Sequence, residues 1–186
     1  MLFTIHYDRI LGKNQEQDEE VMGMLGISLL FVGIVLVSNG VNRLCGVDAK
    51  STAFMNLVTG FIIVSGNLIM LAKAGGILDF QNVASGYLFG FTYLFVAGNY
   101  LFKLDLRPFG WFSGFVAVYA TIMAITSYSV DIRFTLLWGA WAVLWLEGFL
   151  ELVLKLKIGK IFPWLSIAEG IFAAFIPSVF MLLDKW

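Results

Sequence analysis

Six apolar segments of membrane-spanning length, separated by short polar loops, constrain this chain more than any other feature. A helix needs about 20 mostly apolar residues to cross the hydrocarbon of a bilayer. The segments are Met24–Val41, Thr52–Ala72, Ala84–Phe102, Phe109–Tyr128, Phe134–Leu154 and Ile161–Leu183. No loop between them is long enough to fold by itself, so residues 24–186 are predicted to form one all-α integral membrane bundle of six transmembrane helices.

The composition agrees with lipid as the main solvent of the chain. Of its residues 60% are hydrophobic and only 13% are charged, with a mean hydropathy of +0.87. A soluble domain needs far more charged surface than this. The formal net charge of −1 leaves no basic stripe for nucleic acid phosphates, so nucleic acid is excluded as a partner. We therefore expect the function to lie within the membrane.

Lysine and arginine residues in the loops predict the orientation of the bundle. The first, third and fifth loops together contain seven, whereas the opposite side of the bundle has three, namely Lys73, Arg133 and Lys185. Positive loops stay in the cytoplasm, so both ends of the bundle are predicted to face outside. Three spans followed by three spans also predict a 3+3 repeat of inverted topology.

Residues 1–23 differ from the rest of the chain. The stretch Asn14–Glu20 is polar and acidic, and no hydrophobic region of a signal peptide precedes the first span. We predict a disordered N-terminal extension or an overlong gene start, with Met1, Met22 and Met24 as possible first residues. An acidic arm on the outer side is the alternative.

Aromatic residues form rows on two of the predicted spans. The fifth span has Phe134, Trp138, Trp141 and Trp145 at intervals of four, three and four, which places them on one helical face. The third span has Phe89 and Tyr93 four residues apart. Such rows often serve packing or face lipid, but two rows facing each other would form a flat slot. This slot would suit a planar neutral amide such as urea, since stacking offsets part of the lost hydration and weak binding permits release.

Carboxylates within the spans are candidates for the polar groups of such a slot. Glu169 lies inside the sixth span, and Glu147 and Glu151 lie one turn apart in the fifth. Ionisable groups at this depth are costly and usually face the bundle interior or a wet path. The structural alternatives are an interhelical hydrogen bond for Glu169 and an i,i+4 ion pair with Lys155 for Glu151.

Small and polar residues elsewhere in the spans are interpreted as structural. Gly26, Gly33 and Gly40 recur every seven residues and predict a smooth seam for close helix approach. Pro177 is expected to bend the sixth span. Helix bridging or capping is expected of most of the asparagines, which are Asn39, Asn56, Asn67 and Asn99.

Catalytic and metal-binding patterns are absent from the sequence. It has one cysteine, Cys45, and one histidine, His6, and it lacks GxSxG, HExxH and Walker motifs. We therefore predict that the protein is not an enzyme and needs no metal or cofactor.

Several motifs resemble one membrane protein family over residues 24–183. LLFVGIVLVSNG, KSTAFMN, LFGFTYLFVAGN, LDLRPFGWFS, LWGAWAVLWLEGFLE and GKIFPWLSIAEGIFAAFIP are similar to the bacterial urea channel and amide transporter family (UreI/AmiS). The resemblance implies a homohexamer in the bacterial inner membrane, with a urea path in each six-helix protomer. The path residues that it implies are Leu29, Val32, Leu36, Phe89, Tyr93, Trp138, Trp141, Leu144, Trp145 and Glu169. We add Glu147 to this set because of its depth within the fifth span.

Two departures from the family pattern affect the prediction. Phe134 stands where acid-gated members have a tryptophan, so the resemblance does not predict the width of the outer mouth. The outer loops are short and contain no histidine, so the usual proton switch is absent. We predict a passive channel for urea or short aliphatic amides that is open at neutral pH. A proton-coupled transporter using Glu169 is the main alternative, and an intramembrane enzyme or a purely structural oligomer fits less well. Urea and acetamide share one planar head and are not distinguished by the sequence.

Overall fold

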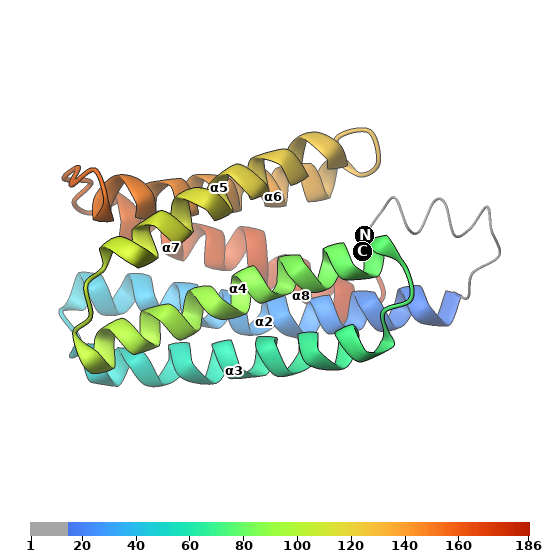
Figure 1. The fold of residues 1–186 in the computed structure, drawn as a ribbon, viewed down its shortest axis with the longest axis horizontal. Coiled ribbons are helices and arrows are strands. Elements are labelled where there is room, and N and C mark those ends of the chain that lie inside the picture. The colour runs from blue at the N-terminus through green and yellow to red at the C-terminus, as the bar shows by residue number, and fades with distance from the viewer. Residues whose placement is uncertain (1–14) are drawn as a thin grey trace.

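The computed structural model describes residues 15–186, which form six helical rods (Figure 1). The first five are α2 (Gln15–Cys45), α3 (Ala49–Lys73), α4 (Ile77–Phe102), α5 (Arg107–Ser127) and α6 (Ile132–Leu152). The last rod consists of α7 (Ile161–Glu169), the π-helix η1 (Gly170–Phe175) and α8 (Ile176–Leu182). The described part of the chain contains no strand, so the prediction of an all-α six-helix bundle is confirmed.

Several helices begin earlier than the apolar segments suggest. α4 begins at Ile77 rather than Ala84, because the Asp79 carboxylate accepts the backbone N–H groups of Gly75 and Gly76 at 2.9 and 3.0 Å. The predicted boundary at Met24 falls within α2, which begins at Gln15. Residues 1–14, with His6, lie outside the described residues, and the first residue of the native chain stays a prediction.

The outer surface of the bundle is apolar. Within the described residues, five rods are long and apolar enough to cross a membrane, and α4 is not among them. Large apolar side chains are exposed on several helices, for example Phe61 (69%), Phe115 (74%) and Leu136 (67%). Lipid would cover these side chains, whereas the lower hydropathy of α4 comes from polar residues that face inward, as described below.

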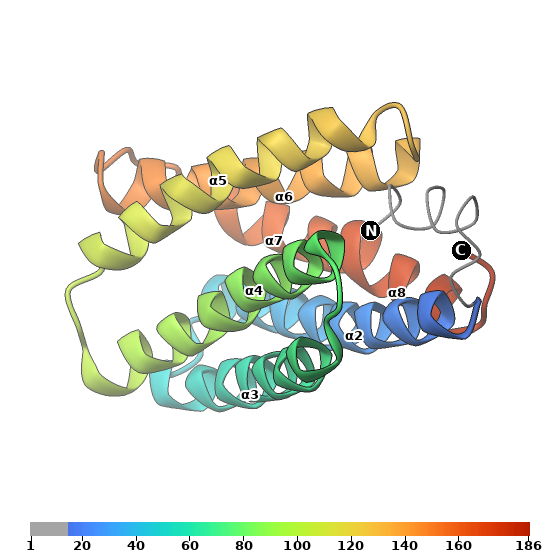
Figure 2. The same ribbon diagram turned by 45° about the vertical axis from the view of Figure 1, so that its right-hand side comes forward.

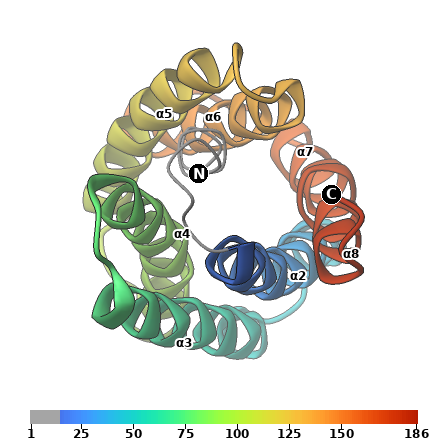
Figure 3. The same ribbon diagram turned by 90° about the vertical axis from the view of Figure 1, so that its right-hand side faces the viewer.

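The rods pack as three pairs arranged in a ring (Figure 3). α3 packs on α4, α5 packs on α6, and α2 packs on the last rod. Figure 2 shows α7 between α6 and α2, with α8 alongside α2. Since successive rods alternate in direction, the two halves of the chain have opposite topology (Figure 1). A structural repeat between these halves stays a prediction.

The glycine seam of the first span packs against the last rod, as the spacing predicts. A Cβ atom on Gly33 would lie 2.9 Å from the carbonyl oxygen of Gly170, and one on Gly40 would lie 2.5 Å from that of Pro163. Both contacts are with backbone, which cannot swing aside. The seam therefore sets the distance between α2 and the last rod.

Alanine at Gly40 is expected to destabilise the protein, because its methyl group would overlap the Pro163 carbonyl. Overpacking of this kind costs about 1–3 kcal/mol. Gly139 on α6 is the matched control, since a Cβ atom there meets nothing within 4 Å. Thermal unfolding in detergent should show a lower midpoint temperature for Gly40→Ala than for the parent protein, whereas the midpoint temperature of Gly139→Ala should be unchanged. Equal midpoints for the two variants would contradict the close approach.

The last rod changes its winding next to Pro177. The π-helix covers Gly170–Phe175 and ends just before the turn that contains this proline. Proline has no N–H to donate, and its ring displaces the preceding turn. Pro177 therefore explains why the helix widens into a π-helix just before it. π-Helical segments inside α-helices occur often at functional sites, and this one begins directly after Glu169.

Candidate solute path

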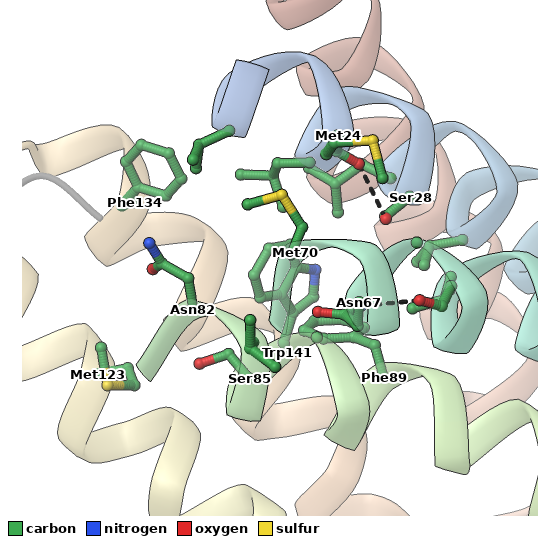
Figure 4. Close-up of a pocket in the computed structure, with 18 of the residues that line it drawn as sticks. Met24, Ser28, Asn67, Met70, Asn82, Ser85, Phe89, Met123, Phe134 and Trp141 are labelled. Atoms are coloured by element: carbon green, nitrogen blue, oxygen red, sulfur yellow. Dashed lines mark hydrogen bonds between the residues drawn. The ribbon is translucent and has the colours of Figure 1, made fainter. Parts of the chain in front are cut away.

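Two cavities lie inside the bundle, one toward each end of the rods. The first, the Met24 cavity, has a volume of about 110 Å³ and is bordered by Met24, Asn67 and Met123 among others (Figure 4). The second, the Arg43 cavity, has a volume of about 190 Å³ and is bordered by Arg43 and Glu151 among others. α2, α4 and α6 contribute to both cavities.

A single layer of aromatic rings separates the two cavities. Phe89 on α4 and Trp141 on α6 line both of them. Their ring centroids are 4.8 Å apart and their planes are nearly perpendicular, at 84°. Phe89 is also 4.8 Å from the ring of Trp145. We call Phe89 and Trp141 the aromatic constriction.

The structure brings nine of the eleven predicted path residues to the cavity walls. The tryptophans are buried rather than directed into lipid, with Trp138, Trp141 and Trp145 only 9%, 3% and 7% exposed. The Met24 cavity is lined by Leu29, Val32 and Trp138, the Arg43 cavity by Leu36, Tyr93, Leu144 and Trp145, and both by Phe89 and Trp141. The aromatic rows of α4 and α6 therefore face each other.

The two remaining predicted residues, Glu147 and Glu169, line neither cavity. Glu147 follows Trp145 by two residues, about 200° round the helix, so it leaves α6 on a different side. Both side chains are buried, 6% and 5% exposed. Neither Glu147 oxygen nor Oε2 of Glu169 has a hydrogen-bond partner within the described residues. The two carboxylates are close enough to interact electrostatically, and Glu169 is also close enough to interact with Tyr93.

Glu151 pairs with a different residue from the one predicted. Its carboxylate accepts hydrogen bonds from both terminal nitrogens of Arg43, with Nη1 3.1 Å from Oε2. The predicted pair with Lys155 is wrong, because α6 ends at Leu152 and Lys155 has a left-handed backbone with φ of 59°. The i,i+4 geometry requires a continuous helix.

Polar residues of α4 on the cavity walls were missed by reading only the aromatic row. Thr92 accepts the indole N–H of Trp145 at 3.2 Å and donates to the Leu88 carbonyl at 2.7 Å. The α4 residues that line the cavities are spaced three and four apart, so the periodicity that revealed the aromatic row could also have revealed the polar residues on the same face. The cavity-lining residues of α4 include Asn82, Ser85, Phe89, Thr92, Val96 and Asn99.

The asparagines divide between bridging and lining. Asn39 and Asn56 exchange two amide hydrogen bonds between α2 and α3, at 2.9 and 2.7 Å. Asn67 donates to the Ile63 carbonyl at 2.8 Å and also borders the Met24 cavity. Asn99 borders the Arg43 cavity. The indole N–H of Trp141 has no partner within the described residues and is a free donor at the constriction.

A helical membrane bundle with two aromatic-walled cavities in line defines a channel or transporter for small solutes. The profile of the AmiS/UreI family transporters matches residues 24–185, and the chain belongs to this family. Its relatives are channels and transporters rather than enzymes. The acid-activated urea channel of Helicobacter pylori is 40% identical over 194 residues, which cover 88% of this chain and 100% of the relative. A protein of Mycolicibacterium smegmatis described as a transporter of amidate substrates is 34% identical, covering 88% of this chain and 78% of the relative.

Solved structures of a relative have the same fold. The crystal structure of the urea channel of H. pylori superposes with a TM-score of 0.81 at 41% identity, covering 87% of this chain and 99% of that chain. The cryo-EM structure of the H. pylori urea channel in its closed state gives a TM-score of 0.80 at 40% identity, with the same coverage.

Proposed function

We propose that this protein is a passive channel through which urea or short aliphatic amides cross the membrane. The route runs from the Met24 cavity through the aromatic constriction to the Arg43 cavity. The observation that carries this proposal is that Phe89 and Trp141 line both cavities, so one layer of rings is all that separates them. The urea channel and amide transporter among the relatives support the solute class.

The walls suit a planar neutral solute for two reasons. Flat aromatic faces can stack on an amide and offset part of its lost hydration, and the free indole N–H of Trp141 can donate to its carbonyl oxygen. Neither contact is strong enough to trap the solute. Phe89 and Trp141 carry no charge, so an ion at the constriction would lose its water without compensation.

Stopped-flow light scattering of proteoliposomes tests the proposal. Vesicles with the protein should equilibrate with urea and acetamide faster than protein-free vesicles, whereas glycerol should enter both at the same rate. Urea entry at the rate of protein-free vesicles would refute the proposed function.

Urea flux is expected to be insensitive to mild acid, changing by less than about twofold between about pH 7 and about pH 5. The outer loops contain no histidine. Burial raises the pKa of Asp131 in the outer loop before α6, but hydrogen bonds from the side chain and backbone N–H of Arg133 bring this pKa below its ordinary value. A lowered pKa keeps the carboxylate ionised until the pH falls below that value, so Asp131 does not titrate in this range. A steep rise in flux on acidification would contradict this expectation.

A proton-coupled amide transporter is the second candidate. It is favoured by both oxygens of Glu147 and by Oε2 of Glu169, which are buried without a hydrogen-bond partner among the described residues. Buried carboxylates in membrane proteins often carry protons. Uphill uptake of labelled acetamide driven by a pH gradient, and its loss in Glu169→Gln, would establish coupling and refute the passive channel.

We further propose that the protein assembles as a homohexamer in the bacterial inner membrane, with the loop after α2 in the cytoplasm. The excess of Lys and Arg in the odd loops supports this orientation. Cys45, the only cysteine of the chain, is exposed at the end of α2 and reports the side of this loop.

Membrane-impermeant maleimide should label Cys45 in inside-out vesicles but leave it unlabelled in intact cells. The physical reason is that the thiol would lie on the cytoplasmic face, out of reach from outside. Labelling in intact cells would reverse the orientation.

A further inference from the structure

One end of the Arg43 cavity is formed by the ends of several helices. Arg43 is in the last turn of α2, and Glu151 is next to the last residue of α6. Phe162 is the second residue of α7. All three residues line the cavity, and the side chains of Arg43 and Glu151 are 38% and 24% exposed. These residues therefore stand where the cavity meets the surface.

The Arg43 guanidinium connects three helices at this mouth. It binds the Glu151 carboxylate through both terminal nitrogens, and its Cζ atom lies 4.9 Å from the ring centroid of Phe162. A planar guanidinium makes both contacts at once, because its edge pairs with the carboxylate while its face lies on the ring. Two contacts of different kinds hold its orientation.

The ion pair joins helices that do not pack closely on each other. In the described part of the chain, α2 packs on α3 and on the last rod, whereas α6 packs on α5 and on α7. Figure 3 shows α2 and α6 on different sides of the ring. A contact between their side chains therefore crosses the opening between the helices.

We propose that the Arg43–Glu151 pair is a bar across this mouth that limits the size of the amides entering the Arg43 cavity. The inference deepens the proposed function by assigning a size-selecting element to the path. A pair that keeps contact with water separates readily. Small amides pass beside the bar, and larger ones must wait for it to open.

Chemical access to the cavity tests this inference separately from urea flux. Leu144 lines the Arg43 cavity, so Leu144→Cys in a Cys45→Ser background places one thiol behind the bar. Its reaction rate is measured with iodoacetamide, itself a short amide, and with the bulkier N-benzylmaleimide. The ratio of the two rates reports the size limit and is independent of overall thiol reactivity.

Arg43→Ala or Glu151→Ala should raise the rate ratio of bulky to small reagent about tenfold, because either substitution removes the ion pair. Arg43→Ala also removes the contact with Phe162. The exchanged pair Arg43→Glu with Glu151→Arg should return the ratio to its original value. Arg107→Ala is the matched control. It breaks another arginine–carboxylate pair, with Asp105, and Arg107 does not line the cavity. Its ratio should not change.

An unchanged ratio in the alanine variants, or no recovery in the exchanged pair, would overturn the proposal. If the alanine variants fail to fold, Arg43→Lys decides. Lysine keeps the charge but cannot bind the carboxylate through two nitrogens, so the ratio should rise, and an unchanged ratio overturns the bar. Absence of urea flux through the parent protein would refute the proposed channel but would not change the outcome of the rate-ratio measurement.

Discussion

Alanine in place of Trp141 is expected to abolish most of the selectivity between urea and glycerol. The Trp141 indole lines both cavities and meets Phe89 edge-on at 4.8 Å. Its truncation would join the cavities into one wider passage and remove a stacking surface. Because a pocket that loses shape loses its discrimination between small solutes, the urea-to-glycerol permeability ratio should fall about tenfold. Stopped-flow shrinkage of proteoliposomes measures the ratio.

Trp111→Ala is the control for this prediction. Trp111 is 55% exposed on the outer face of α5, so the same indole is removed without touching the path. Truncating a buried tryptophan also costs about 3–5 kcal/mol of stability, and Trp141→Phe is therefore measured alongside. It keeps a ring and should keep most of the ratio. An unchanged ratio in folded Trp141→Ala would show that solutes do not pass this residue.

Methionine at Glu147 is expected to stabilise the protein and to leave urea flux intact. Glu147 is 6% exposed, and its two oxygens have no hydrogen-bond partner within the described residues. Removing a poorly compensated carboxylate from a membrane helix should raise the free energy of unfolding by about 2 kcal/mol. Methionine has a similar length and makes no polar demand. Thermal unfolding in detergent and urea flux are measured on the same preparation.

Glu147→Gln is the matched control, since it removes the charge but keeps the polar group. Its stability should lie between those of the parent protein and Glu147→Met. A loss of stability in Glu147→Met would mean that the carboxylate has a partner supplied by its surroundings. A loss of flux in both variants would favour proton coupling over a passive channel.

Features set by local periodicity were predictable from the sequence. The 4-3-4 spacing of Phe134, Trp138, Trp141 and Trp145 fixes one helical face whatever the neighbouring helices are. Phe89 and Tyr93 follow from the same argument. The structure places both rows in the interior. The glycine seam of α2 was predictable as well, because only small residues permit the approach to Gly170.

Features that depend on distant parts of the chain were not predictable in this way. Arg43 and Glu151 are 108 residues apart, and their pairing depends on how α2 and α6 are placed in the ring. The i,i+4 spacing favoured Lys155 as the partner of Glu151, but this spacing applies only within a continuous helix, and the sequence does not show that α6 ends at Leu152. Pro177 predicted a bend in the sixth span from the sequence, but a proline alone does not specify that the disturbance takes the form of a π-helix.

The most direct test of the central claim is to block the aromatic constriction chemically. Phe89→Cys in a Cys45→Ser background is treated with N-benzylmaleimide, a neutral thiol reagent whose adduct is larger than the phenylalanine side chain, and urea flux is measured before and after. Phe115→Cys on the outer side of α5, where Phe115 is 74% exposed, is the control. If urea passes between α4 and α6, modification at position 89 should reduce its flux to that of protein-free vesicles and modification at position 115 should not. Undiminished urea flux through fully modified Phe89→Cys protein would show that the solute takes another route.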